Sequence, residues 1–200
     1  VASRGLGDVY KRQIGSDTGG SIRFPAANNN IVGLMPTYGR VSRKGVMPLS
    51  WTLDHVGPMT RTVEDAALML HAISGFDPAD RTTSTESVSD FRSALSPDIK
   101  GLQIGILEDS LVDIHPDIEE AMERSIKVFE TLGAQLCPVR IPNYRVLHIA
   151  NSIIYLVEAF NNFGTRLRED SSKLGRIFRI YGYMGGLFSA DEYVQAMRFR

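Results

Sequence analysis

Apolar residues recur at helical spacing in four stretches of the chain. The first, TVEDAALMLHAIS at residues 62–74, opens with an S/T-x-x-D/E capping pattern and is followed by Gly75, a residue that commonly ends helices. Residues 116–132, 143–167 and 190–200 show the same period. The pattern therefore predicts four amphipathic helices. In the first three, the faces expected to be buried are Val63, Ala66, Ala67, Leu70 and Ile73; Ile118, Met122, Ile126 and Phe129; and Val146, Ala150, Ile153, Val157 and Phe160.

Two short apolar runs flank the second of these helices. LQIGILED at residues 102–109 and AQLCPVRI at residues 134–141 indicate strands, and a strand, helix and strand of these lengths form a crossover unit with parallel strands. Residues 15–58 are rich in Gly, Pro, Ser and Asn around short apolar runs, which indicates compact loops joining short buried strands. Residues 76–97 are polar and predict a surface loop. The pattern as a whole predicts one α/β domain.

Composition narrows the kind of partner that the protein binds. The 22 basic and 23 acidic residues give a formal net charge of −1 without a run of like charges, so neither nucleic acid nor a membrane surface is expected as a partner. No apolar run approaches the roughly 18 residues of a membrane span. The single cysteine, Cys137, favours a reducing, cytoplasmic location, and the four histidines lack the close spacing of a metal site. We therefore expect a cytoplasmic protein that binds a small molecule and uses neither metal nor cofactor.

The first 13 residues differ from the rest of the chain. Ser3 to Gln13 shows neither helical nor strand periodicity, and a DNA sequence that encodes SRGLGDVYKRQ resembles the adapter of transposase-based sequencing libraries. We therefore predict a non-native leader at residues 1–13 and part of a single domain at residues 14–200. On this interpretation the natural protein extends upstream of Ile14, and the domain is truncated at both ends.

The stretch GSDTGGSIRFPA, residues 15–26, carries the strongest chemical signal. Gly19 and Gly20 lack Cβ atoms and can aim successive backbone N–H groups at one point, where these groups would stabilise a negative oxygen. Ser21 follows directly, and its hydroxyl is a candidate nucleophile beside the same point. Asp17 and Arg23 bracket the loop and are expected to pair across it as structural support.

Two other interpretations of this stretch are weaker. A flexible linker is disfavoured because IRFPA and an apolar run follow at once, in place of more linker composition. A phosphate-binding loop would place G-K-S/T at the last glycine, whereas this chain has Ser21, Ile22 and Arg23 there.

GSDTGGSIRFPA, followed by VGLMPTYGRVSRKGVMPLSWTLDHVGPMTRTVEDAALML, resembles the signature region of the amidase signature enzymes. The resemblance implies their α/β fold, with a mixed, largely parallel central sheet flanked by helices. It implies that Ser21 is the acyl-enzyme nucleophile and that the main-chain amides of Thr18, Gly19 and Gly20 form the oxyanion hole. The other two catalytic groups of the family, a serine on a cis peptide and a lysine, lie upstream of this motif and are not assigned in this chain. Lys11 belongs to the predicted leader and does not take the lysine's role.

The resemblance implies an amidohydrolase that cleaves a carboxylic amide through an ester on Ser21, and it implies that this piece alone is inactive. A second interpretation within the family is the glutaminase subunit of a glutamyl-tRNA(Gln) or aspartyl-tRNA(Asn) amidotransferase. A hydrolase would act alone or as a homodimer on a small amide, whereas the glutaminase would need amidotransferase subunits B and C. A non-catalytic scaffold paralogue is the alternative from another class, and the intact Ser21 beside two glycines argues against it.

Two further expectations concern single residues outside the glycine-rich stretch. Asn30 stands where the family most often has glycine, and asparagine tolerates a left-handed backbone best among residues with a side chain. Tyr38, Met47 and Trp51 are candidates for a substrate pocket, but aromatic residues and methionine in an apolar block are more often core residues. We therefore expect these three side chains in the core.

Overall fold

The computed structural model describes residues 12–96, 98–108 and 114–200. Lys11 and the other residues 1–11 of the predicted leader lie outside the described residues, as does Asp109 at the end of a predicted strand. The chain forms two compact units. The larger unit combines the residues up to Ala94 with Ile149–Arg200, and the smaller unit is Leu95–His148.

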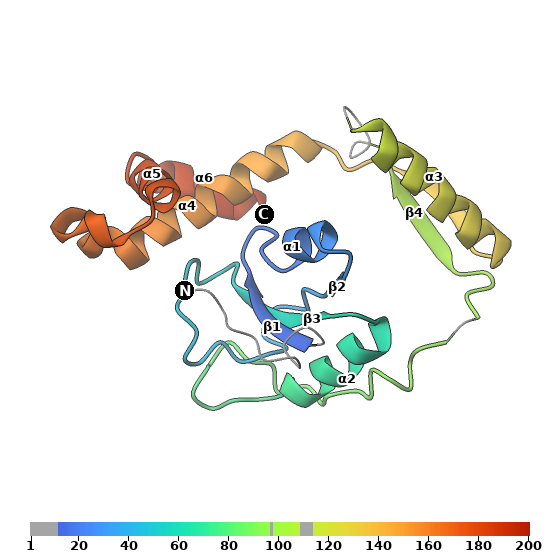
Figure 1. The fold of residues 1–200 in the computed structure, drawn as a ribbon. Helices are drawn as coiled ribbons and strands as arrows, with labels where there is room; N and C mark the ends of the chain where they lie inside the picture. Colours follow the sequence, from blue (N-terminus) through green and yellow to red (C-terminus); the bar gives the residue numbers. More distant parts are fainter. Residues whose placement is uncertain (1–11, 97, 109–113) are drawn as a thin grey trace. The chain divides into compact units, whose positions relative to one another are not determined.

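The larger unit contains a three-stranded sheet with the order β1-β3-β2 (Figure 1). β3 (His55–Thr60) lies between β1 (Arg12–Asp17) and β2 (Val32–Gly33). β1 pairs with β3 along its full length, from Arg12 opposite Thr60 to Asp17 opposite His55. β1 therefore begins within the last two residues of the predicted leader and ends inside the glycine-rich stretch.

The strand directions of this sheet differ from the expected largely parallel arrangement. Both β1 and β2 run antiparallel to β3. A parallel neighbour needs a crossover of a dozen or more residues, usually a helix, and the residues 34–54 that lead from β2 into β3 contain no helix. The α/β class and the presence of both strand directions agree with the prediction, because the smaller unit holds a parallel pair. The larger sheet itself is antiparallel.

The helix predicted at residues 62–74 is present as α2 (Val63–Ile73). The Thr62 hydroxyl accepts the Asp65 N–H at 3.1 Å, which is the cap that the sequence predicts. Leu70 is buried and packs with Val56 of β3 and with Val41, which lies between β2 and β3. The predicted face is buried in its middle, at Ala66, Ala67 and Leu70, whereas Val63 is exposed.

A short helix that the periodicity did not predict follows the glycine-rich stretch. α1 (Arg23–Asn28) has six residues, too few for a helical period to be visible in the sequence. Ile22, just before the helix, is fully buried, and Ala26 within the helix is almost fully buried. Asn30, just after the helix, has a φ of 53°, the left-handed backbone that we expected asparagine to tolerate there.

The long predicted helix is present as α4 (Tyr144–Glu169), but its buried face is shifted. Ala150, Ile154 and Glu158, spaced four residues apart, are buried. The sequence pattern missed this face because it counts apolar residues only, and one of the buried residues is a glutamate. Of the residues predicted on the buried face, Ala150 is buried, and Val146, Ile153, Val157 and Phe160 keep part of their surface exposed.

Three elements follow α4 in the chain, namely η2 (Ser171–Lys173), α5 (Arg176–Gly185) and α6 (Ala190–Phe199). The sequence predicts α6, which begins with a full capping box between Ser189 and Glu192. Ala196 of α6 shares a core cluster with Leu53 and Ile154. In the part of the chain that the structure describes, no helix is both long and apolar enough to cross a membrane.

The smaller unit is the predicted crossover unit. β4 (Gln103–Leu107) and β5 (Gln135–Val139) are parallel, and α3 (Pro116–Thr131) lies between them in the sequence. The predicted strands, helix and pairing direction are confirmed. The predicted burial of the helix face is not observed, because Ile118, Met122 and Phe129 all remain more than a third exposed.

The polar segment at residues 76–96 forms no helix or strand, in agreement with the predicted surface loop. Side-chain hydrogen bonds fix its conformation. Ser42 Oγ donates to Asp77 Oδ2 at 2.6 Å, and the Arg43 N–H donates to Asp80 Oδ2 at 2.8 Å. The hydroxyl of the buried Thr83 donates to the Asp80 carbonyl at 2.8 Å. The loop is thus held to the segment that follows β2.

Candidate active site

The glycine-rich loop lies between the end of β1 and the start of α1, and one carboxylate organises it. Asp17, the last residue of β1, is fully buried. Its Oδ1 accepts the Gly20 N–H at 2.6 Å, and its Oδ2 accepts the N–H groups of Ile22 at 3.2 Å and Arg23 at 3.4 Å. The Arg23 guanidinium adds two bonds, from Nε to Oδ2 at 3.0 Å and from Nη2 to Oδ1 at 3.1 Å. The pair that we expected across the loop is therefore formed.

These contacts keep the Asp17 carboxylate charged. Burial alone would raise the pKa of Asp17, but hydrogen bonds from Arg23, Gly20 and Ile22 outweigh it, so the pKa lies below the ordinary value of 3.8. The hydrogen bond to Asp17 raises the pKa of Arg23. At neutral pH the loop therefore surrounds a buried negative charge that one arginine balances.

Ser21, the predicted nucleophile, is exposed, and its hydroxyl makes no hydrogen bond with the described residues. The N–H groups of Thr18 and Gly19 have no acceptor among the described residues either. A Cβ atom added to Gly19 would meet no atom within 4 Å, so the space beside this residue is open. Gly20 has a φ of 126°, a conformation that residues with a Cβ rarely adopt, and its N–H is engaged by Asp17. Two of the three predicted oxyanion donors are thus unengaged.

Thr18 ties the loop to the segment that precedes β3. Its hydroxyl donates to Asp54 Oδ1 at 2.5 Å. Asp54 is buried, and its carboxylate also accepts the N–H groups of Leu49 at 2.8 Å and Ser50 at 3.0 Å. Two buried carboxylates, Asp17 and Asp54, therefore hold the two ends of the segment Thr18–Gly20.

A third buried carboxylate, Glu158 of α4, fixes the segment that carries Asp54. Glu158 accepts hydrogen bonds from Ser50 Oγ at 2.5 Å, from the Thr52 N–H at 3.0 Å and hydroxyl at 2.8 Å, and from the Tyr193 hydroxyl at 2.7 Å. Burial alone would raise the pKa of Glu158, but these hydrogen bonds outweigh it and hold the pKa below 4.5. Burial and the hydrogen bond to Glu158 raise the pKa of Tyr193 to about 12.

Sequence reasoning identified neither Asp54 nor Glu158. Asp54 lies inside the apolar run PLSWTLDHVGPM, and Glu158 lies four residues after the buried Ile154 on one helix face. In both places the available signal was a carboxylate where the surrounding pattern is apolar. Such a carboxylate is rarely buried without hydrogen-bond partners, so its position alone indicates a polar network.

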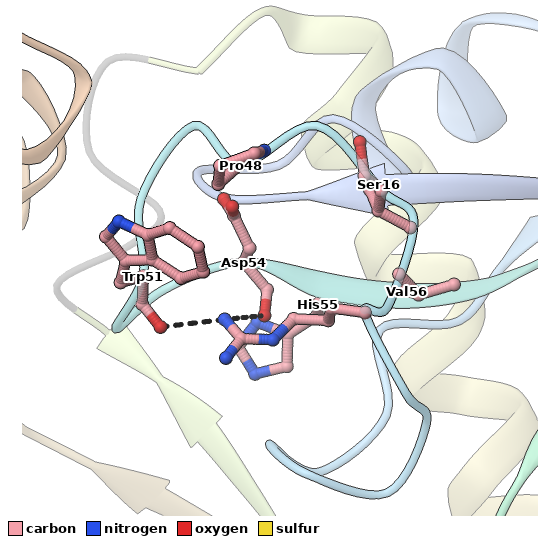
Figure 2. Close-up of a pocket in the computed structure, with 8 residues that line it drawn as sticks. Ser16, Pro48, Trp51, Asp54, His55 and Val56 are labelled. Carbon is pink, nitrogen blue, oxygen red and sulfur yellow. Dashed lines mark hydrogen bonds between the residues drawn. The ribbon is translucent and has the colours of Figure 1, made fainter. Parts of the chain in front are cut away.

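A small recess lies beside the segment that carries Asp54 (Figure 2). Arg43 donates to the carbonyl of Trp51 at 2.7 Å and to that of Asp54 at 3.5 Å, the two bonds drawn in Figure 2. Ser16 lines the recess and Ser21 does not. The recess holds about 20 Å³, room for roughly one water molecule. It is therefore too small to bind a substrate by itself.

The expectation that Trp51 and Met47 belong to the core is wrong. Their side chains are 54% and 71% exposed. Trp51 and Arg43 line a pocket of about 280 Å³, and the indole N–H of Trp51 donates to Asn162 Oδ1 at 2.7 Å. The indole N–H therefore has a protein partner even though the side chain is more than half exposed.

No group of three or more His, Cys, Asp or Glu side chains within residues 12–96, 98–108 and 114–200 could hold a metal ion. His55 Nδ1 lies 2.6 Å from the Leu53 carbonyl, and His71 Nδ1 lies 3.1 Å from the Ser89 carbonyl. Both histidines thus have a main-chain partner for Nδ1.

Comparison with known proteins decides the family. The family model described as Amidase matches residues 8–185 of the chain. The chain belongs to the amidase signature family. The matched region begins inside the predicted leader, whose boundary at residue 13 stays a prediction.

Two relatives show which members of the family the chain resembles. It is 48% identical over 164 residues to a glutamyl-tRNA(Gln) amidotransferase subunit of Akkermansia muciniphila, a match that covers 82% of this chain and 34% of that protein. It is 42% identical over 188 residues to an amidase of Pseudomonas putida, which covers 93% of this chain and 40% of that protein.

A solved structure supports the fold. The chain matches an inhibitor-bound structure from a vestigial protein complex that reveals the evolutionary origins of an s-triazine catabolic enzyme, with a TM-score of 0.87 and 32% identity. The match covers 94% of this chain and 41% of that one. The chain thus spans between 34% and 41% of the length of these three proteins.

Proposed function

We propose that the protein to which this chain belongs hydrolyses a carboxylic amide through an ester on Ser21. Membership of the amidase signature family supports this class of reaction. The observation that carries the proposal is the loop itself, in which an exposed Ser21 follows the unengaged N–H groups of Thr18 and Gly19. Donors that are fixed before the reaction stabilise a transition-state oxyanion without further reorganisation.

In the proposed reaction, Ser21 Oγ attacks the carbonyl carbon of the amide and the carbonyl oxygen gains a negative charge. The N–H groups of Thr18 and Gly19 donate to that oxygen, and the Gly20 N–H is shared between it and Asp17 Oδ1. Collapse of the intermediate breaks the C–N bond, releases ammonia or an amine and leaves an ester on Ser21. Water then cleaves the ester, which yields the carboxylic acid and restores the serine hydroxyl.

Ser21 needs a proton acceptor for this attack. We propose a Ser-Ser-Lys triad whose bridging serine and lysine are supplied by residues outside this chain. A lysine kept partly neutral by desolvation would accept the Ser21 proton through the bridging serine and return it to the departing amine. Asp17 and Arg23 take no part in this transfer, because their charges satisfy each other in the loop.

The second candidate function is the glutaminase of a tRNA-dependent amidotransferase. The observation that favours it is that some relatives with the amidotransferase name reach 47% to 48% identity, against 42% for the amidase of P. putida. Other relatives with that name are 38% and 40% identical, so identity alone does not separate the two functions. On this function the amide is glutamine, and the two partner chains of the amidotransferase use the ammonia. Copurification with two partner chains and a tRNA-dependent product would separate this function from a hydrolase that acts alone.

The test compares Ser21→Ala with Ser16→Ala in the complete protein encoded by the full reading frame. Ser16 is an exposed serine of the same stretch, so its replacement is a matched control. Ammonia release is measured from glutamine and from simple aliphatic and aryl amides. Ser21→Ala is expected to lower kcat by about a thousandfold or more, and Ser16→Ala is expected to keep it. A Ser21→Ala protein that keeps its activity would contradict the proposal.

A further inference from the structure

We propose that Asp54 is a positioning residue for the oxyanion-binding segment Thr18–Gly20 and acts through the Thr18 hydroxyl. The inference rests on the proposed function, since it gives Asp54 a part in the same reaction. Its support is the hydrogen bond from Thr18 Oγ1 to the buried Asp54 carboxylate.

The segment Thr18–Gly20 needs restraint at both ends. Two of its three residues are glycines, which lose more conformational freedom on ordering than any other residue. The Asp17 carboxylate fixes the side of Gly20 through hydrogen bonds to the N–H groups of Gly20 and Ile22. On the other side, the bond from the Thr18 hydroxyl to Asp54 is the one hydrogen bond that the described residues make with Thr18 or Gly19. The position of these two predicted donors thus depends on Asp54.

Asp54 is itself held firmly enough to act as an anchor. Its carboxylate accepts the N–H groups of Leu49 and Ser50 in addition to the Thr18 hydroxyl. The N–H of Asp54 donates to the Ser50 carbonyl at 2.9 Å, which closes the turn around the carboxylate. Glu158 accepts the Ser50 hydroxyl at 2.5 Å and so connects this turn to α4. A continuous set of hydrogen bonds therefore runs from α4 to the loop that carries Ser21.

The chemical consequence concerns the transition state more than substrate binding. An oxyanion donor acts only when it lies within hydrogen-bond distance of the developing negative oxygen, and one donor is worth about a hundredfold or more in kcat. A displacement of about 1 Å far from the reacting atoms can lower the rate about a hundredfold. Loss of the bond between Thr18 and Asp54 should therefore lower kcat and leave KM nearly unchanged.

The test uses Thr18→Val, Thr18→Ser and Thr83→Val in the complete protein. Thr18→Val removes the hydroxyl and keeps the shape, Thr18→Ser keeps the hydroxyl, and Thr83→Val removes a buried threonine hydroxyl from the loop at residues 76–96 as a matched control. We measure kcat, KM and the rate at which a fluorophosphonate reacts with Ser21. Thr18→Val is expected to lower kcat and the fluorophosphonate rate about tenfold or more, with KM within about twofold, and Thr18→Ser is expected to recover most of this loss. Equal losses in Thr18→Val and Thr83→Val would overturn the proposal.

A double-mutant cycle tests whether Asp54 acts through Thr18. Asp54→Asn is measured alone and combined with Thr18→Val. If the carboxylate acts through the hydroxyl, the second substitution adds little to the loss of kcat caused by the first. Losses that multiply in the combined variant would overturn the proposed route.

Amide hydrogen exchange separates failure of this inference from failure of the proposed function. Exchange is followed in peptides that cover residues 15–24. If the unsubstituted protein does not react with the fluorophosphonate at Ser21, the proposed function fails. The restraint of Thr18–Gly20 by Asp54 is then tested by hydrogen exchange alone. A rise in exchange specific to Thr18→Val supports the restraint by Asp54, and the same exchange in Thr18→Val and Thr83→Val overturns it.

Discussion

The Arg23 guanidinium lies 3.0 Å from Asp17 Oδ2, and the two side chains differ sharply in burial, since that of Arg23 is 50% exposed and that of Asp17 is fully buried. An exposed ion pair usually contributes little to stability because water and salt screen it. Here the carboxylate also accepts three main-chain N–H groups of the loop, so the pair belongs to a network that determines the loop's shape.

Arg23→Gln is expected to destabilise the complete protein by about 1 kcal/mol in chemical denaturation. A charged hydrogen bond contributes about 1.5 to 3 kcal/mol, and the solvent exposure of Arg23 reduces that figure. The matched control is Arg92→Gln, which removes an arginine from an exposed pair with Glu64 and should leave stability unchanged. Equal effects of the two substitutions would show that the Asp17 network does not depend on Arg23.

The free energy of unfolding should fall as the pH drops through the acid range. Asp17 and Glu158 have folded-state pKa values below their ordinary 3.8 and 4.5, so each contributes stability that is fully present above the ordinary value. That contribution is lost as the pH falls through the lower, folded-state pKa, because the unfolded chain then binds more protons than the folded one. Denaturant midpoints measured between about pH 6 and 3 check this. Stability that stays constant in this range would contradict the charged, hydrogen-bonded state of both carboxylates.

Tyr193→Phe is expected to destabilise the larger unit by about 1 kcal/mol, the usual net contribution of one hydrogen bond. The substitution removes the 2.7 Å bond to Glu158, which keeps its three other hydrogen bonds. It should also abolish an ultraviolet titration near pH 12, because burial and Glu158 raise the pKa of Tyr193 to about 12. Tyr181→Phe, at a tyrosine that is 47% exposed, is the control and should leave stability unchanged.

The sequence predicted the long helices and the crossover unit well, because a repeated apolar period over ten or more residues is a strong signal. It missed α1, whose six residues are too short to show a period, and it also missed α5, although α5 has ten residues. On α4 it placed Ile153 and Val157 on the buried face, whereas Ile154 and Glu158 are the buried residues. The sequence pattern predicted no strand direction in the larger sheet, where β2 has only two residues; both pairings observed there are antiparallel.

The residues of the candidate site also fall into those that the sequence predicted and those that it missed. Ser21, its glycines and the pair of Asp17 and Arg23 lie within one short stretch, so their spacing could be evaluated from the sequence. Asp54 and Glu158 lie far from that stretch in the chain and reach it through long-range hydrogen bonds. The local sequence shows only a carboxylate in apolar surroundings at each position, and the partners of these carboxylates follow from the fold.

The 200-residue chain, expressed as printed, is expected to show no amidase turnover above background. Ser21 Oγ has no hydrogen-bonded base among the described residues, and a serine without a proton acceptor is a weak nucleophile. Ammonia release from glutamine and simple amides checks this. Turnover by the printed chain that disappears in Ser21→Ala would contradict a triad completed from outside it.

The role of Ser21 as nucleophile is tested most sharply by mapping the site at which a fluorophosphonate attaches to the complete protein. The reagent is incubated with the protein, and the labelled peptide is located by mass spectrometry, with Ser16→Ala and Ser21→Ala proteins alongside. We expect one phosphonylated residue, Ser21, in both the unsubstituted and the Ser16→Ala protein, and no label in Ser21→Ala. A label on any other residue, or one that persists in Ser21→Ala, would show that Ser21 is not the nucleophile.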